Sequence, residues 1–314
     1  MRVLAIDSSG LTATVAVVED EQTIAEYTVN YKKTHSQTLL PMIDEVKKMI
    51  DLDLSSIDAI AVSGGPGSFT GLRIGSATAK GLGLALGKPL IHVPTVDTLA
   101  YNVYGCGDLI CPIMDARRKQ VYTGLYSFSH EVKDGTHLTE AAFHVEEQQM
   151  AIAVEELIGK LNAYKRPVVF LGDGVPVYRQ MLEEGLEVPY SFAPSYMNRQ
   201  RAAVVGALGI AYYYAGKYET AKAHKPDYLR VSQAERERAQ REKEAKTEVR
   251  EMTIEDGAVV AEIEHQSFSD AWSEKAILET LEQNNSVCFV AEKAGKRVGY
   301  LLGYTAVDEV EIAR

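Results

Sequence analysis

A glycine-rich loop followed at once by a long helical pattern is the feature that most constrains this chain. The loop and its flanks read Ser63-Gly64-Gly65-Pro66-Gly67-Ser68-Phe69-Thr70-Gly71-Leu72-Arg73. Residues 58–62 before it predict a short buried strand, and the Gly/Pro cluster permits backbone angles that a Cβ atom would forbid. A strand, such a loop and a helix N-terminus can together bind an anion, because free N–H groups and the helix dipole point into the turn. The alternative is a tight connection that only lets the helix pack. The loop lacks the Gly-Lys-Ser/Thr ending of a Walker loop.

Small residues continue at a helical spacing after this loop. They are Gly71, Gly75, Ala79 and Gly83, four positions apart, and they predict one smooth helix face that another helix can approach closely. A second helix is expected over residues 36–50, where apolar side chains recur at intervals of four, three and four. These side chains are Leu39, Ile43, Val46 and Ile50. The two surfaces either pack within one domain or contact a partner.

The first 230 residues alternate between strand and helix patterns. Strand pairs are expected over residues 3–7 and 14–18, with a third strand over 23–29, and again over 109–115 and 121–128. The second group continues with a helix over 146–162, a strand over 168–171 and a helix over 200–214. Asp7 and Asp115 hold equivalent points in two similar hairpins. We interpret this as a weak internal repeat and expect an α/β fold with two lobes, about 1–105 and 106–230.

Composition excludes several classes of protein. The net charge is −11, which argues against broad autonomous binding of nucleic acid. The three cysteines have no disulfide-framework or metal-ligand spacing, and no apolar run approaches the length of a signal peptide or membrane span. We therefore expect a cytoplasmic protein.

Residues 1–230 resemble the TsaB family, the dimerisation subunits of the bacterial machinery that makes threonylcarbamoyladenosine in tRNA. The matching runs are Ile6-Asp7-Ser8-Ser9, the segment from His35 to Ile43, the Gly-Pro-Gly-Ser-Phe-Thr-Gly-Leu-Arg loop, and Asp115-Ala116-Arg117-Arg118 with Val121-Tyr122 and a closing Pro226-Asp227-Tyr228-Leu229-Arg230. The resemblance implies the actin, Hsp70 and sugar-kinase (ASKHA) architecture with a cleft between related lobes. It also implies a non-catalytic subunit that pairs with a TsaD-like catalytic subunit, works with a TsaE-like ATPase, reaches tRNA only through the complex, and forms a homodimer when alone.

In that superfamily each hairpin wraps nucleotide phosphate, so ATP or ADP at the partner interface is the implied ligand. The first hairpin keeps small residues, but the second has Arg117, Arg118 and Lys119 where a close backbone cradle needs glycine, although their charge could meet an anion from further away. For Asp7 we favour a turn-forming aspartate over a catalytic one. The candidate nucleotide or anion contacts are Asp7, Ser8, Ser9, Gly67, Ser68, Thr70, Arg73, Asp115 and Arg117.

The same resemblance assigns the two helices to the partner interface. The interface residues it implies are Leu39, Ile43, Val46, Leu72, Gly75, Ala79, Leu82 and Gly83. Catalytic relatives carry a His-x-x-x-His metal pair, but no two of the seven histidines here are four apart. We therefore expect neither a metal site nor a catalytic residue.

The composition changes after Arg230. Residues 231–248 are rich in Glu, Arg and Lys and predict a charged linker. Residues 249–314 have strand and helix signals, with Thr253 and Asp256 as candidate caps. The run from Phe268 to Ser273 and the strand pair after it resemble the N-terminal half of the GNAT acetyltransferases, most closely those of the RimI type that acetylate a ribosomal protein.

The Gly-rich turn that holds the acetyl-CoA pyrophosphate in that family does not follow here, so we expect a fragment of a longer fusion, with acetyl-CoA binding only in a full-length domain. A second class of function is kept open, either a GNAT acyltransferase as the main activity of the full fusion or an ATP-binding kinase of the two-lobed class. Nucleotide binding would distinguish the kinase from a partner subunit.

Overall fold

The computed structural model describes residues 1–31, 34–133, 137–138, 141–230, 238, 247–306 and 309–314. The chain divides into two compact units, Met1–Arg230 and Val231–Arg314, which are described separately below. Most of the predicted linker, residues 231–237 and 239–246, lies outside the described residues. Among the helices that are described, none has both the length and the apolar character that a membrane crossing requires.

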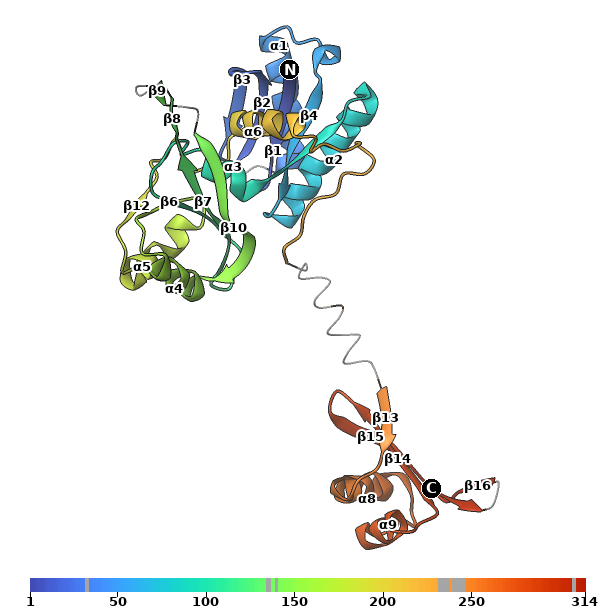
Figure 1. Cartoon of the computed structure of the whole chain (residues 1–314). Coiled ribbons are helices and arrows are strands. Elements are labelled where there is room, and N and C mark those ends of the chain that lie inside the picture. The colour runs from blue at the N-terminus through green and yellow to red at the C-terminus, as the bar shows by residue number, and fades with distance from the viewer. Residues whose placement is uncertain (32–33, 134–136, 139–140, 231–237, 239–246, 307–308) are drawn as a thin grey trace. The chain divides into compact units, whose positions relative to one another are not determined.

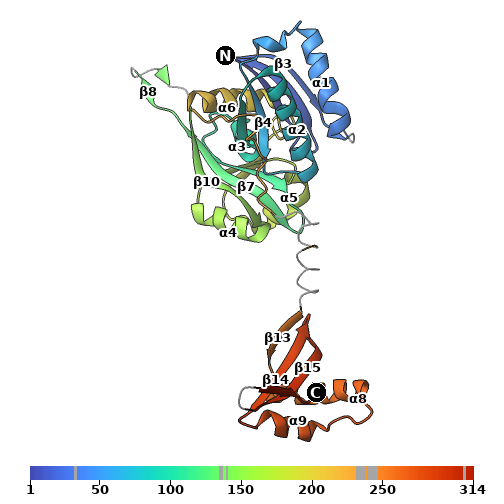
Figure 2. The same cartoon turned by 90° about the vertical axis from the view of Figure 1, so that its right-hand side faces the viewer.

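The first lobe of unit 1 is a five-stranded mixed sheet covered on both faces. Its strands are β1 (Arg2–Asp7), β2 (Ala13–Glu19), β3 (Gln22–Val29), β4 (Ala59–Gly65) and β5 (Leu90–Pro94), in the order β3-β2-β1-β4-β5. The first three strands pair antiparallel, whereas β1, β4 and β5 pair parallel. One face packs against α1 (His35–Met49) and α2 (Phe69–Leu86), with the short helix η1 (Leu54–Ser56) between α1 and β4. Figure 2 shows α1 and α2 beside this sheet.

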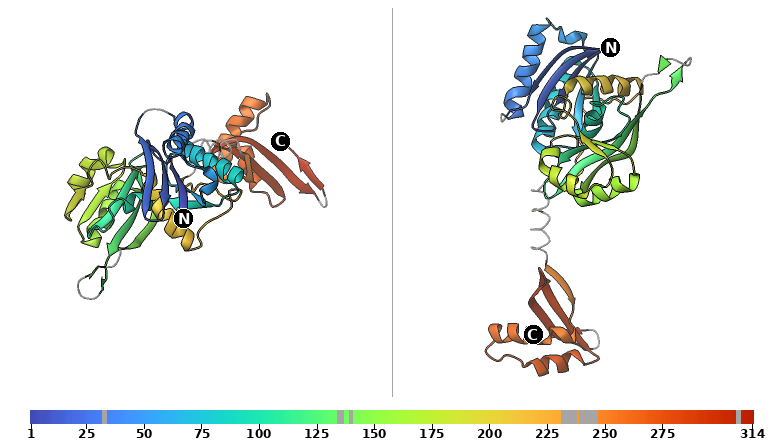
Figure 3. Two further views of the ribbon diagram at one scale, coloured as in Figure 1. Left: turned by 90° about the horizontal axis from the view of Figure 1, so that it is seen from above. Right: turned by 90° about the vertical axis from the view of Figure 1, so that its left-hand side faces the viewer.

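The second lobe repeats the same strand order. Its strands are β6 (Leu109–Asp115), β7 (Gln120–Ser129), β10 (Ala142–Ala153), β11 (Val168–Leu171) and β12 (Tyr190–Phe192), in the order β10-β7-β6-β11-β12. One face packs against α4 (Val154–Tyr164) and α5 (Val175–Gly185), and the other against α3 (Thr95–Tyr101) (Figure 3, right). A short hairpin of β8 (Val132–Lys133) and β9 (His137–Leu138) forms a separate sheet. The internal repeat predicted from the two hairpins is confirmed.

Two predicted boundaries were wrong. Helix α6 (Ala202–Tyr214), which we placed in the second lobe, packs on the free face of the first sheet (Figure 1). It fits closely because it carries glycine at the contact: a Cβ atom at Gly206 would lie 2.5 Å from Val18 Cγ2. The chain thus returns to the first lobe after completing the second. The predicted helix over 146–162 begins only at Val154, because residues 142–153 pair with β7 as strand β10.

Unit 2 is an antiparallel four-stranded sheet with two helices. It comprises β13 (Thr247–Glu251), η2 (Ile254–Asp256), α8 (Gly257–Ser267), α9 (Glu274–Leu281), β14 (Ser286–Lys293), β15 (Lys296–Ala306) and β16 (Glu309–Ile312), with the strands in sequence order. The strand pair expected after Ser273 is β14 and β15, and at the turn between them Ala294 and Gly295 both have positive φ. Val260, Ile277 and Leu302 are among the fully buried residues of its core.

The predicted caps of unit 2 form one capping box. The Asp256 carboxylate accepts the backbone N–H and the hydroxyl of Thr253. Asp256 is fully buried, and its carboxylate also accepts hydrogen bonds from Arg250 at 2.7 Å and from Arg297 at 2.9 Å. The Arg250 guanidinium, with the bonds from Thr253 and Arg297, holds the pKa of Asp256 well below its usual range. One carboxylate therefore joins β13, η2 and β15.

Candidate functional site

A cleft of about 450 Å³ lies between the turns of the two lobes. It brings together five of the nine predicted contacts, which are Ser9, Gly67, Ser68, Asp115 and Arg117. The other four do not line it. Asp7 and Ser8 are buried, and Thr70 and Arg73 lie exposed in the first turns of α2.

Asp7 is a structural residue of the first hairpin. Its carboxylate accepts the backbone N–H of Ser9 at 2.8 Å and the Ser9 hydroxyl at 2.7 Å, and the Ser63 hydroxyl donates a short hydrogen bond to it from β4. Complete burial raises the pKa of Asp7, and the bonds from Ser63 and Ser9 oppose that change. The bond to the N–H two residues ahead is the local turn that we favoured for this residue.

The glycine-rich loop closes against the first hairpin. The N–H of Ser68 donates to the Ser9 carbonyl at 2.6 Å, and the Ser68 side chain accepts the N–H of Gly71 at 3.3 Å as the N-cap of α2. A Cβ atom at Gly67 would lie 2.4 Å from the same Ser9 oxygen. The close approach that glycine permits is therefore used by the chain itself, and two N–H groups that an anion would need already have partners.

The turn of the second hairpin is built without glycine. Arg117, Arg118 and Lys119 all have φ between 56° and 65°, a left-handed conformation that is unfavourable for residues with a Cβ atom. Asp115 supports the turn by accepting the Arg117 N–H at 2.8 Å and the Tyr178 hydroxyl at 2.8 Å. Burial, together with the hydrogen bond to Asp115, raises the pKa of Tyr178 to about 12. The bulky basic side chains stand where a backbone phosphate cradle would need small ones.

Arg73 takes part in a contact on α2 instead of the cleft. Its guanidinium carbon lies 4.0 Å from the centre of the Phe69 ring, and its Nε donates to the Tyr228 hydroxyl at 3.3 Å. The Phe69 and Tyr228 rings are 4.7 Å apart. These contacts fasten the end of unit 1 to the start of α2.

The residues predicted for a partner interface lie on the inward faces of both helices, so they are not available to a partner. All but one of those residues are buried within unit 1, and Leu82 is half-buried against the same core; the buried ones are Leu39, Ile43, Val46, Leu72, Gly75, Ala79 and Gly83. The small face of α2 packs inward because Gly75 meets Ser8 and Gly83 meets Leu90. The outward faces carry Leu40 and Met49 on α1 and Leu84 on α2, all exposed.

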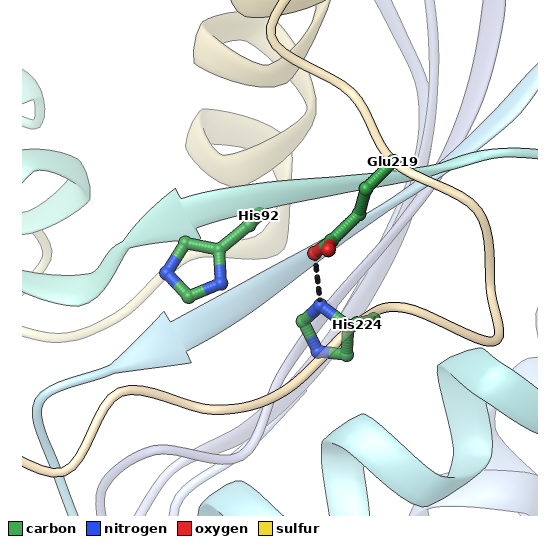
Figure 4. A group of neighbouring side chains, drawn as sticks. All are labelled: His92, Glu219 and His224. Carbon is green, nitrogen blue, oxygen red and sulfur yellow. Dashed lines mark hydrogen bonds and ion pairs between the residues drawn. The ribbon is translucent and has the colours of Figure 1, made fainter.

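A second polar cluster was not found from the sequence. His92, Glu219 and His224 come together on the first lobe, as Figure 4 shows. Histidine spacing along a helix does not reveal this cluster, because His92 is far from the other two residues in sequence. The five-residue spacing of Glu219 and His224 gives little signal by itself.

Comparisons with known proteins agree on the first unit. Residues 22–238 match the model of a family described as TsaD, tRNA N6-adenosine threonylcarbamoyltransferase. The tRNA threonylcarbamoyladenosine biosynthesis protein TsaB of Bacillus subtilis (strain 168) is 34% identical over 237 residues, which cover 75% of this chain and 96% of that protein. The protein of the same name from Escherichia coli (strain K12) is 36% identical over 129 residues, or 40% of this chain and 55% of that protein. A crystal structure of a Pseudomonas aeruginosa protein, described as uncharacterized with similarity to peptidase YEAZ, has a TM-score of 0.59 and 26% identity, and covers 73% of this chain and 99% of that chain.

Proposed function

Because this chain belongs to the TsaB family, we propose that its first unit is a non-catalytic subunit of the complex that forms N6-threonylcarbamoyladenosine in tRNA. The names of its relatives support this process, and the match to the TsaD family model supports a catalytic partner of related fold. The repeated strand order of the two lobes supports the ASKHA architecture.

The observation that carries the non-catalytic role is the closed first hairpin. The N–H of Ser68 is bonded to Ser9, and the second turn presents Arg117 and its neighbours in place of glycine. Such a cleft is poorly suited to hold a nucleoside triphosphate for phosphoryl transfer. This also disfavours the kinase alternative. ATP or ADP would enter at the interface with the partner, a TsaE-like ATPase would join the assembled pair, and tRNA would bind through the complex, since this chain carries a net charge of −11.

We place the partner surface on the outward faces of α1 and α2. Leu40 and Leu84 are 56% and 65% exposed there, so each of the two neighbouring helices offers an apolar side chain for a partner to bury. A groove of about 1090 Å³ between β3 and α1, lined in part by Tyr27, Pro41 and Met49, adjoins this surface. In the absence of the partner, the same surface would support a homodimer.

The test is reconstitution with the TsaD-like subunit of the same organism. We expect threonylcarbamoyladenosine to form in tRNA only when both chains, the remaining factors and ATP are present. Leu40→Glu should abolish co-elution with the partner and reduce product formation. The control Val132→Glu, at a site of the second lobe that is 65% exposed, should do neither. Product formation without this chain, or unchanged co-elution of Leu40→Glu, would contradict the proposal.

We propose that the second unit is related to the GNAT N-acetyltransferases of the RimI type. The support is its succession of a strand, two helices and three antiparallel strands, which agrees with the resemblance of residues 249–314. Acetyl-CoA would be the cofactor of a complete domain of this type. A titration of this 314-residue chain with acetyl-CoA, followed through the fluorescence of Trp272, should show no binding, because the Gly-rich pyrophosphate turn is not among these residues.

A further inference from the structure

The cluster of His92, Glu219 and His224 has the composition and compactness of a metal site. One nitrogen of each imidazole and one oxygen of Glu219 lie within 4.8 Å of one another. His92 lies in the middle of β5, and the other two come from the segment that follows α6. Figure 4 shows one ring nitrogen of His92 turned toward the pair formed by Glu219 and His224.

Backbone contacts hold two of these residues in place without help from their side chains. Glu219 forms an isolated antiparallel bridge with Leu90, in which each N–H donates to the other carbonyl at 2.8 and 2.9 Å. The N–H of His224 donates to the Thr220 carbonyl at 3.2 Å, and Lys80 Nζ on α2 donates to the His224 carbonyl at 2.9 Å. The segment is therefore positioned in advance on β5 and α2, which lowers the cost of arranging ligands.

The neighbouring strand is shaped around the His92 ring. A Cβ atom at Gly64 would lie only 2.0 Å from His92 Cε1, so the imidazole occupies the space that a side chain would fill. His92 Nε2 also lies 3.1 Å from Asp227 Oδ2. A carboxylate behind a histidine is the usual second partner of a metal-bound imidazole, where it fixes the orientation of the ring.

The polar atoms of the cluster are incompletely satisfied. The His224 side chain is fully buried, and its Nδ1 is hydrogen-bonded to Glu219 Oε1 at 2.7 Å. Within the described part of the chain, Nε2 of His224 is buried without a hydrogen-bond partner, whereas Nε2 of His92 faces Asp227 Oδ2. Since Nδ1 is the His224 nitrogen that faces Glu219, this contact, and not Nε2, marks where an ion would bind.

We propose that His92, Glu219 and His224 bind a divalent transition-metal ion, with Zn²⁺ as the best fit. Two imidazoles and one carboxylate form a ligand set that zinc accepts, and a fourth position stays open for solvent. The ion takes the place of the proton that His224 Nδ1 and Glu219 Oε1 share. It thereby fastens the segment that begins at Glu219 to the edge of the first sheet.

Binding requires only local adjustment of side chains. Ligand atoms about 2.0–2.1 Å from zinc in a tetrahedron are about 3.3 Å apart. The 2.7 Å contact between His224 and Glu219 must therefore open slightly, and the wider separations, at most 4.8 Å, must contract. The backbone bridge at Leu90 is left intact by such movements.

The test uses the untagged 314-residue chain after treatment with a chelator. We expect isothermal titration with ZnCl₂ to give one tight site per chain, and Co²⁺ loading to give the visible spectrum of a four-coordinate ion. At a free Zn²⁺ concentration 100 times the dissociation constant, the folding equilibrium constant should rise about 100-fold, which a shift in thermal unfolding detects.

Glu219→Gln is the decisive variant, because it keeps the shape and the hydrogen-bonding capacity of the side chain while removing the charge. It and His92→Gln should weaken Zn²⁺ binding at least tenfold and abolish the Co²⁺ spectrum. The exposed histidines at positions 144 and 265 serve as controls, and His144→Gln and His265→Gln should bind as the parent does. If Zn²⁺ does not bind the parent chain, or if Glu219→Gln binds it unchanged, the cluster is only a hydrogen-bonded clasp and the proposal is wrong.

Discussion

The contact between α2 and the first hairpin predicts that Gly75→Ala destabilises unit 1. A Cβ atom at Gly75 would lie 2.5 Å from Ser8 Oγ but 3.8 Å from Ser8 Cβ, so the clash is with the hydroxyl alone. That hydroxyl donates to the Gly71 carbonyl at 2.8 Å. It therefore cannot turn away from the new methyl group without giving up a buried hydrogen bond.

The expected magnitude follows from three contributions. Overpacking costs about 1–3 kcal/mol, and loss of the Ser8 hydrogen bond costs about 1 kcal/mol. Replacing glycine by alanine in a helix returns about 1 kcal/mol. The free energy of unfolding of unit 1 should thus fall by about 1–3 kcal/mol. Gly81→Ala in the same helix meets no atom within 4 Å and should instead stabilise by up to about 1 kcal/mol.

Urea unfolding of the 314-residue chain can follow the stability of each unit independently. Trp272 is the only tryptophan and lies in unit 2, so its fluorescence should be unchanged, while the circular dichroism transition of unit 1 moves to lower urea. Adding Ser8→Ala removes the obstructing hydroxyl. The double variant should therefore be more stable than the sum of the single changes predicts, by about 1 kcal/mol or more. If Gly75→Ala is as stable as Gly81→Ala, or if the double variant is simply additive, the close contact does not exist.

Two further predictions concern buried carboxylates. Arginine partners depress the folded pKa of Asp256, so its contribution to stability is complete above the unfolded pKa of about 3.9 and declines as pH falls below that value. Asp256→Asn should remove this pH dependence and destabilise unit 2 at pH 7 by about 2–3 kcal/mol. This is below the roughly 3–5 kcal/mol typical of breaking a fully buried ion pair, because the arginines are partly exposed. An unchanged urea midpoint of Trp272 fluorescence would contradict the prediction. Tyr126→Phe removes the hydroxyl that donates to buried Asp97 at 2.7 Å, and should lower the stability of unit 1 by about 1–3 kcal/mol in circular dichroism, with no change if the bond is absent.

Local sequence signals predicted the parts of the fold that short stretches determine. The turn at Asp7, the repeated hairpins and the capping box at Thr253 all depend on residues a few positions apart. Local sequence patterns predicted the wrong structure where contact with a distant segment determines the conformation. Residues 142–153 become a strand because β7 is available as a partner, and α6 joins the first lobe because that sheet has a free face.

The candidate site shows the same limit. The spacing of small residues on α2 correctly indicates a closely packed face, but spacing cannot say whether that face meets the chain's own core or another protein. The residue types at the cleft could likewise be predicted from the sequence, but their hydrogen bonds could not. The cluster around His92 required the pairing of β5 with a segment more than 120 residues away, which no local pattern reveals.

The glycine-rich loop and the start of α2 therefore form a close packing contact inside the first lobe. Gly67, Gly71 and Gly75 all lie where a Cβ atom would strike Ser8 or Ser9, so each one lets α2 and its leading loop press against the first hairpin. The same packing turns the opposite side of α2 outward beside α1, with Leu40 and Leu84 exposed. Because the inner surfaces of α1 and α2 are occupied by this packing, we propose the outer faces of the two helices as the partner surface.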